Sequence, residues 1–301
     1  MRYKFSIVDV FSAKPFGGNQ LAVLPHAEGL SAETMQAVAR EFNFAESTFV
    51  LPATDPTHTC RVRIFTPKAE MPFAGHPTIG TACVLARGNL GATGQRDLVF
   101  AEGIGPVHVS VKDDGGTLRG MLTLHTKAEQ SAFAGPTSAL ADMLSLSPTD
   151  IVEGFFASVG LPFCFAHLAG RDAVDRAILD RPAWSKVLAK APSSAVFVFA
   201  GHPANGGELY ARMFAPALGV EEDPATGSAS AALVGAMAAR DALADGAFTL
   251  SILQGVAMGR RSEIAAIARK AKGEVTSISV AGATAFVAEG EIDLPSHAAG
   301  A

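Results

Sequence analysis

The sequence predicts an α+β protein built from two similar halves. A two-part motif occurs twice in the same order, alternating strands are joined by a hairpin turn, and small apolar residues form a long segment after each copy of the motif. Hairpins mixed with helices favour mixed sheets over a doubly wound parallel sheet. The 301 residues also suffice for two domains of about 150 each.

The repeated motif is the strongest of these signals. Residues 63–67 read RIFTP, and after a short spacer residues 76–82 read HPTIGTA. Residues 212–216 read RMFAP, and residues 223–229 read DPATGSA. The second parts are 147 positions apart, close to half of the chain. Two motifs repeated in one order at a near-constant offset indicate a duplicated domain rather than a solenoid.

Local patterns predict the elements of the first half. Ser31 is a good N-cap, and Met35 and Phe42 follow it at helical spacing, so we expect an amphipathic helix over residues 32–43. Strands are expected where apolar and polar residues alternate, and the acidic and glycine residues at 113–116 form a hairpin turn. These strands cover residues 21–24, 60–64, 107–111 and 118–124.

The second part of each motif copy predicts the start of a helix. A proline follows His76 and Asp223, which places both residues at the N-cap and Pro77 and Pro224 at the first helical position. The segments that follow are apolar on almost every side, so each helix is expected to be buried in its half. They cover residues 78–87 and 225–240.

A buried helix start needs a polar partner, because its first N–H groups have no intrahelical acceptor and carry partial positive charge. Gly80 and Gly227 remove side-chain bulk near these ends, while Thr81 and Ser228 add hydroxyl groups. A single such motif is explained by an ordinary cap or turn residue. The duplicated pair favours a site for a carboxylate-sized anion at the interface between the halves.

Glu46 lies in the stretch FNFAESTFV at positions 42–50, between the expected helix and an apolar strand. A carboxylate held there is partly desolvated, which raises its pKa above the ordinary value of about 4.3 and suits it to proton transfer. Position alone favours an ordinary surface glutamate at a helix–strand junction.

Composition excludes several other classes of protein. The net charge is −5, and hydrophobic residues make up 49% of the chain, so neither a nucleic-acid-binding surface nor a disordered chain is expected. Cys60, Cys83 and Cys164 are far apart, which fits a reducing cytoplasm and excludes a cysteine zinc site. No apolar run is long enough to span a membrane. Histidine spacing predicts no metal site, and no complete nucleotide-binding glycine loop occurs.

Several segments together resemble the PhzF family of phenazine-biosynthesis-like isomerases, in the expected order over nearly the whole chain. They are Gly18-Asn19, residues 43–47 (NFAES), residues 74–82 (AGHPTIGTA), residues 222–229 (EDPATGSA) and Gln254-Gly255 with Met258-Gly259-Arg260. The resemblance implies a diaminopimelate-epimerase-like fold, in which two pseudo-equivalent lobes each wrap a barrel-like mixed sheet around a central helix. The implied lobes are residues 1–125, completed by about 280–301, and residues 126–279, with the active site in the cleft between them.

The resemblance also assigns residues to the site. Glu46 is the implied acid/base, with His76, Asp223 and Ser228 completing the catalytic group. Asn19, Gly75, Thr78, Gly80, Thr81, Gly227 and Ala229 are expected to bind substrate. No cofactor or metal is implied, and the expected assembly is a cytoplasmic homodimer. This chain departs from the family pattern at Gln20, Ala45 and Arg261, where proline, serine and proline are common.

We therefore expect a cofactor-independent isomerase that moves a proton within a small carboxylate-bearing metabolite, such as a cyclic amino or hydroxy acid. Two alternatives remain open from the sequence. One is a non-catalytic protein that binds a small acid in the same cleft, and the other is an epimerase or lyase acting on a different acid. An intact Glu46 favours chemistry over binding alone.

Overall fold

A computed structural model describes residues 1–294, and it divides the chain into two compact units. The first unit comprises Met1–Leu122 together with residues 282–294, and the second comprises Thr123–Ala281. The expected first lobe extended to about residue 301, and its last seven residues, 295–301, lie outside the described part of the chain.

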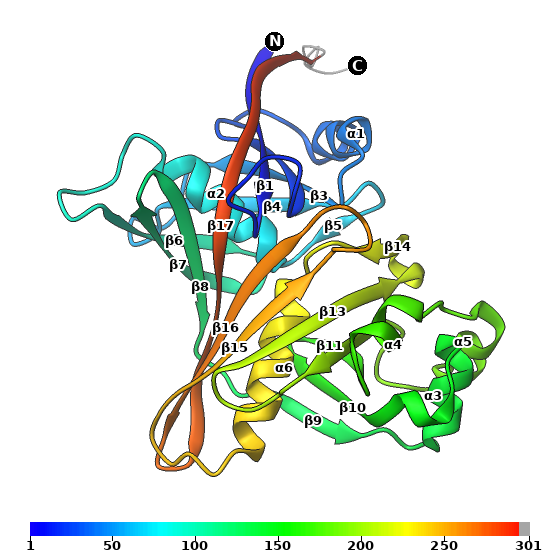
Figure 1. The fold of residues 1–301 in the computed structure, drawn as a ribbon. Helices are drawn as coiled ribbons and strands as arrows, with labels where there is room; N and C mark the ends of the chain where they lie inside the picture. The colour runs from blue at the N-terminus through cyan, green and yellow to red at the C-terminus, as the bar shows by residue number, and fades with distance from the viewer. Residues whose placement is uncertain (295–301) are drawn as a thin grey trace. The chain divides into compact units, whose positions relative to one another are not determined.

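The first unit is a mixed sheet with two helices (Figure 1). Its elements are β1 (Arg2–Val10), β2 (Asn19–Leu24), α1 (Ala32–Phe42), β3 (Glu46–Leu51), β4 (Cys60–Phe65), β5 (Glu70–Met71), α2 (Gly75–Ala86), β6 (Gln95–Glu102), β7 (Gly105–Asp114) and β8 (Thr117–Leu124). The helix and strands expected from the sequence are present within a few residues of their predicted bounds. Ser31 caps α1 as predicted, because its side chain accepts a hydrogen bond from the backbone N–H of Thr34.

The second unit contains the remaining elements, the last of which, β17, continues into the first unit. They are β9 (Glu129–Ala132), α3 (Thr137–Leu144), η1 (Pro148–Asp150), β10 (Ile151–Val159), β11 (Leu161–Leu168), α4 (Arg171–Arg176), α5 (Arg181–Val187), β12 (Val196–Gly201), β13 (Gly207–Ala215), η2 (Pro216–Leu218), β14 (Val220–Asp223), α6 (Gly227–Arg240), β15 (Gly246–Gln254), β16 (Ser262–Ala271) and β17 (Glu274–Asp293).

Strand pairing within each unit shows the duplication directly. In the first unit β1–β2 is antiparallel, β2–β3 parallel, β3–β4 antiparallel, β4–β6 parallel and β6–β7 antiparallel. In the second unit the same sequence of directions runs through β10–β11, β11–β12, β12–β13, β13–β15 and β15–β16. Each buried helix, α2 or α6, occupies the same place in this order.

The last strand of the chain serves both units. Its first part pairs with β16, and residues 284–293 pair antiparallel with β1. The C-terminal part of this strand therefore lies in the first unit. β9 has the matching place in the second unit, where it pairs with β10, the counterpart of β1.

Each unit buries one helix against its strands. α2 contacts β1, β2, β3 and β7, while α6 contacts β9, β10, β11, β15 and β16. Close packing leaves no room for a side chain at Gly80, since a Cβ atom there would lie 2.6 Å from Leu21 Cδ2 and 2.7 Å from Val10 Cγ2. The helix therefore approaches β1 and β2 at the position where the sequence provides glycine.

The prediction that His76 and Asp223 are N-caps is wrong. α2 begins earlier, with Ala74 as the N-cap, because the Thr78 N–H already donates to the Ala74 carbonyl. α6 begins later, with Thr226 as the N-cap. Asp223 remains in β14, where it pairs with Met213 of β13.

The arginine of each motif copy anchors its strand. Arg63 forms a two-point ion pair with Glu70 at 2.7 Å, and Arg212 forms one with Glu222 at 2.9 Å. Arg212 also donates to the carbonyls of Val174, Asp175 and Ala177 at the C-terminal end of α4. A cation is favourable there because a helix C-terminus carries partial negative charge.

These matched arginines provide a test of the fold. Lysine cannot reproduce the planar two-point contact, and at position 212 it also loses most of the carbonyl contacts. We expect Arg212→Lys to lower the free energy of unfolding by about 1–3 kcal/mol more than Arg63→Lys. Denaturant unfolding of both variants measures the difference, and equal losses would show that the contacts at α4 contribute nothing.

Candidate active site

The first unit brings two predicted catalytic residues into contact. Glu46 begins β3 and His76 lies in the first turn of α2. Glu46 Oε2 is 3.4 Å from His76 Nε2, and the side chains are 18% and 6% exposed. Phe44, two residues before Glu46, stacks on Phe42. The expectation that Glu46 is partly desolvated agrees with this burial.

His76 is electrically neutral at physiological pH. Burial lowers the pKa of its imidazole to about 3, and a hydrogen bond with the backbone of Gln20 opposes the shift only in part. Nε2 has no hydrogen bond to the described residues, so the ring nitrogen bonded to Gln20 is Nδ1. A neutral imidazole that donates Nδ1–H to a carbonyl presents the lone pair of Nε2, here toward Glu46.

A buried hydrogen bond holds the strand and the helix in register. Thr48 lies two residues after Glu46, and its hydroxyl is 2.8 Å from that of Thr81, one turn after His76. Both threonines are fully buried. The contact joins β3 to α2 beside the Glu46–His76 pair, so the hydroxyl of Thr81 is engaged within the protein.

Other predicted substrate-binding residues of the first unit lie around the same helix start. Asn19 is 2% exposed and begins β2, directly before Gln20. Gly75 is in the first turn of α2. The Thr78 hydroxyl lies 2.8 Å from both the Ala74 carbonyl and the Glu102 carboxyl group, so it too is engaged within the protein.

The predicted residues of the second unit surround the start of α6. Asp223 is 8% exposed, and its Oδ2 accepts a hydrogen bond of 2.6 Å from the Thr226 hydroxyl. Gly227, Ser228 and Ala229 form the first turn, in which Ser228 is half-buried. Their N–H groups precede the first intrahelical bond, which Ser230 donates to Thr226.

Sequence reasoning missed the residues that hold these predicted groups in place. They are Gln20 and Thr48 in the first unit, and Thr226 and Gln254 in the second. Gln254 is fully buried and donates from Nε2 to the Asp223 carbonyl at 2.8 Å. Gln254 lies in a motif that carries the family resemblance. An amide side chain at the end of an apolar strand was the signal that could have identified its role.

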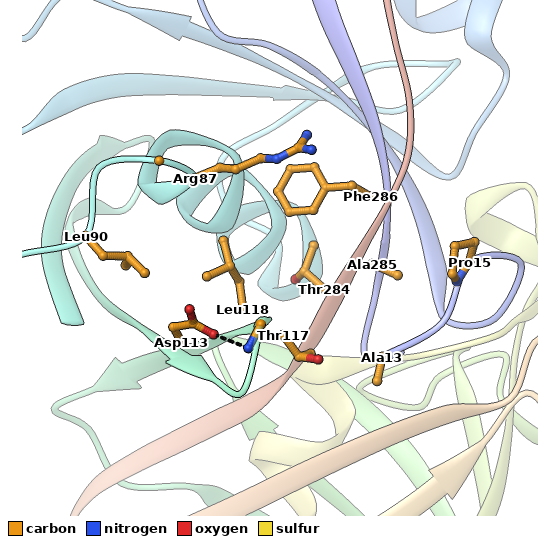
Figure 2. A pocket seen from close by; sticks show the side chains of 12 residues that line it. Ala13, Pro15, Arg87, Leu90, Asp113, Thr117, Leu118, Thr284, Ala285 and Phe286 are labelled. Atoms are coloured by element: carbon orange, nitrogen blue, oxygen red, sulfur yellow. Dashed lines mark hydrogen bonds between the residues drawn. The ribbon is translucent and has the colours of Figure 1, made fainter. Parts of the chain in front are cut away.

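A cavity of about 580 Å³ in the first unit lies away from this pair, past the C-terminal end of α2 (Figure 2). Its charged groups already have partners. Arg87 lies over the ring of Phe286 and donates to Glu289, while Asp113 accepts from the Gly116 N–H. The cavity contains none of the predicted site residues.

Within residues 1–294, no three histidine, cysteine or acidic side chains are grouped so that they could hold a metal ion. Over the same residues, no helix is both long and apolar enough to cross a membrane.

The repeated strand order, with one buried helix in each unit, defines an α+β protein of the diaminopimelate-epimerase-like class. The chain belongs to the PhzC-PhzF family, described as phenazine biosynthesis-like protein, whose model matches residues 8–290. An uncharacterized isomerase of Mesorhizobium japonicum is 38% identical and aligns over 96% of this chain and 98% of its own length.

A trans-2,3-dihydro-3-hydroxyanthranilate isomerase of Pseudomonas aeruginosa is 36% identical and aligns over 96% of this chain and 98% of its own length. A crystal structure of a PhzF-family phenazine biosynthesis protein from Bacillus anthracis matches with a TM-score of 0.84. That match covers 98% of this chain and 100% of the other at 24% identity, and it supports the fold. The protein is an isomerase of this family.

The Thr48–Thr81 contact can be tested by a double-mutant cycle. Valine has the shape of threonine without the hydroxyl, so Thr48→Val or Thr81→Val alone leaves one buried hydroxyl unsatisfied. We expect each single change to lower the free energy of unfolding by about 1–3 kcal/mol. The double variant should lose less than the sum of the two single losses, and additive losses would contradict the contact.

The neutral state of His76 predicts a stability profile. The folded pKa of about 3 lies below the ordinary value of 6.5, so the unfolded chain binds the proton more readily. The contribution of this group to stability is complete above about pH 6.5 and is lost as the pH falls toward 3. NMR of the His76 ring should show no titration between about pH 5 and 8, and a midpoint near 6.5 would contradict burial of a neutral ring. Spectra of His76→Asn assign the resonance.

Proposed function

We propose that the protein is a cofactor-independent isomerase that uses Glu46 to move a proton within a small carboxylate-bearing cyclic amino or hydroxy acid. The observation that carries this proposal is the contact between Glu46 Oε2 and the Nε2 atom of a neutral His76. The name of the Pseudomonas relative, which specifies a dihydro-hydroxyanthranilate, supports the substrate class.

The imidazole controls the proton on Glu46. Because Nε2 presents a lone pair, a carboxylate at 3.4 Å is repelled, whereas a protonated carboxyl group can donate to it. The carboxylate, which is the form that takes the first proton, therefore gains no stabilisation from Nε2 and is reactive as a base, whereas the acid formed after proton removal can donate to Nε2. A group that is ready both to lose and to regain a proton suits a shuttle.

The proposed reaction needs one carboxyl group. Glu46 takes a proton from a carbon next to an unsaturated system, and the electron pair of the broken C–H bond enters that system. The same carboxyl group returns a proton to another carbon as the electron pair forms the new C–H bond. Positioned acid/base catalysis contributes about 10²–10⁴-fold, so the transferred proton must already be activated by conjugation.

The second copy of the duplicated unit carries no equivalent carboxyl group. Ser47 pairs with Phe65, and Val196 pairs with Phe214, which is the same position of the repeated motif. The residue before Val196, and hence the counterpart of Glu46, is Ala195. This difference supports a mechanism with one base at this position rather than a base in each copy.

The second unit is proposed to contribute to substrate binding. The first-turn N–H groups of α6 and the Ser228 hydroxyl suit a carboxylate, because a helix N-terminus attracts anions without a lysine or arginine. Asp223 is proposed to complete the polar group, with its side chain oriented by Thr226. A homodimer remains our expectation for the assembly.

Replacing Glu46 tests the proposed chemistry. Glu46→Gln keeps the size of the side chain but cannot accept a proton, so turnover of trans-2,3-dihydro-3-hydroxyanthranilate should fall by about 100-fold or more with unchanged affinity. Glu41→Gln, an exposed change on α1, is the matched control. Turnover is followed by absorbance, and affinity is measured by calorimetry.

Full activity in Glu46→Gln would overturn the role of Glu46. If the wild type binds this acid and related cyclic amino acids but never exchanges their carbon-bound protons with D₂O, the protein is instead a small-acid-binding protein. NMR of the ligand after incubation in D₂O distinguishes these outcomes.

A further inference from the structure

Strand register identifies two residues as counterparts in the duplicated units. Arg61, two residues before the motif arginine of β4, pairs with Ala101 of β6. Tyr210, two residues before the motif arginine of β13, pairs with Leu253 of β15. The next residues along β6 and β15 are Glu102 and Gln254, so a carboxyl group and an amide of nearly the same shape occupy equivalent positions.

Gln254 holds the start of the buried helix in the second unit. It is fully buried, and its Oε1 accepts from the Thr226 N–H at 3.1 Å. Its Nε2 donates to the Asp223 carbonyl at 2.8 Å and contacts the Thr226 hydroxyl at 3.0 Å. The amide thereby fixes Asp223 at the end of β14 and the segment that leads from it into α6.

Glu102 contacts the equivalent helix start in the first unit. It is 9% exposed, and its Oε1 lies 2.8 Å from the hydroxyl of Thr78, two residues after His76. Its Oε2 is buried and has no hydrogen-bond partner among the described residues.

Counting protons assigns the state of Glu102. The Thr78 hydroxyl is 2.8 Å from the Ala74 carbonyl and 2.8 Å from Glu102, but it has one proton to donate. A carbonyl can only accept, so when Thr78 donates to Ala74 the contact with Glu102 is a hydrogen bond only if the carboxyl group donates to Thr78. Both contacts form only when Glu102 is protonated, and in that state Glu102 supplies a donor and an acceptor as Gln254 does.

Glu102 and Gln254 are each followed by a glycine, and the two glycines pack in the same way. A Cβ atom on Gly103 would lie 2.7 Å from Pro72 Cα, and one on Gly255 would lie 2.5 Å from the Pro224 carbonyl oxygen. Each glycine therefore allows the end of its strand to pack closely against the segment that leads into the helix. The carboxyl or amide group and the glycine both contact that segment, and we call these two contacts together the clasp.

We propose that Glu102 is a positioning residue that, as a neutral acid, clasps the first turn of α2 and so holds His76 in place for proton transfer at Glu46. This inference rests on the proposed function. Glu102 acts through Thr78 and does not itself touch the reacting atoms.

The surroundings of Glu102 favour its neutral form. Burial raises the pKa of its carboxyl group to about 8, and only donation by Thr78 to an ionised carboxylate would oppose the shift. The Cys60 thiol on β4 interacts with it and is neutral at pH 7, because burial raises the pKa of that thiol to about 12. His76 on α2 is also neutral, and Arg96 on β6 donates to the Leu85 carbonyl.

Ionisation of Glu102 breaks the clasp. A carboxylate can only accept, so the single proton of the Thr78 hydroxyl must serve either Ala74 or Glu102. The first turn of α2 then loses one of its two contacts as the pH rises past about 8.

The test compares Glu102→Gln, Glu102→Leu and the exposed control Glu41→Gln. Glutamine keeps a donor for Thr78, as Gln254 does in the other unit, whereas leucine removes it. With trans-2,3-dihydro-3-hydroxyanthranilate at pH 6.5, we expect kcat to fall less than about threefold in Glu102→Gln and at least about tenfold in Glu102→Leu, with KM little changed. The fall in kcat between about pH 7 and 9 should weaken in Glu102→Gln relative to the wild type and Glu41→Gln.

A stability measurement tests the protonation state without any substrate. The folded pKa of Glu102, about 8, exceeds the ordinary value of 4.5. The contribution of this group to wild-type stability is therefore complete below about pH 4.5 and declines as the pH rises to about 8. Glu102→Gln should lack this decline, and its midpoint in urea should rise relative to the wild type across that range.

Two results would overturn the inference. Parallel stability profiles of wild type and Glu102→Gln would show that Glu102 is not held neutral. Loss of activity in Glu102→Gln as large as in Glu102→Leu would show that the carboxyl group itself is required. If the wild type turns over no substrate, the stability profiles still decide whether Glu102 is neutral, while the proposed function alone fails.

Discussion

Burial of a helix N-terminus is the constraint on which this structure depends. Each unit encloses an apolar helix within its strands, and the first turn of such a helix leaves N–H groups that need polar partners. The neighbouring strands supply polar groups near these ends: the Gln20 backbone and the Thr48 hydroxyl contact side chains of α2, and Gln254 accepts from the Thr226 N–H before α6. The polar groups required for stability thus lie where we propose that a small acid binds and a proton moves.

The two units use one scaffold with different side chains at matched positions. Glu46 corresponds to Ala195, and His76 corresponds to Asp223 in the repeated motif. The arginine of the motif is retained in both copies, because each forms a two-point ion pair with a glutamate of the adjacent strand. The residues that stabilise the strands are therefore alike, whereas those proposed to carry the chemistry differ.

Much of the fold was predictable because it follows from local residue patterns or from the repeated motif. The motif at residues 63–82 and 212–229 predicted the duplication, and Ser31 with the helical spacing after it predicted α1. The exact helix starts were not predictable from the prolines alone. Thr226 donates its N–H to Gln254, which is 28 residues away in sequence, so a long-range contact determines where α6 begins.

The site was predictable at the level of residue types but not of partners. Glu46 and His76 were expected from their motifs and lie in contact. The lone pair that His76 presents to Glu46 depends on a hydrogen bond with the backbone of Gln20, which no side-chain pattern encodes. Thr48 likewise reads as an ordinary strand residue until its contact with Thr81 across the unit is known.

Transfer of a labelled hydrogen tests the central claim most directly. A trans-2,3-dihydro-3-hydroxyanthranilate deuterated at the carbon that loses its proton is converted in H₂O, and the early product is analysed by mass spectrometry and NMR. On the proposal that one shielded carboxyl group removes and returns the proton, part of the deuterium should appear at the receiving carbon. Product that carries only solvent hydrogen there, even in the first turnovers, would contradict a single-carboxyl shuttle at Glu46.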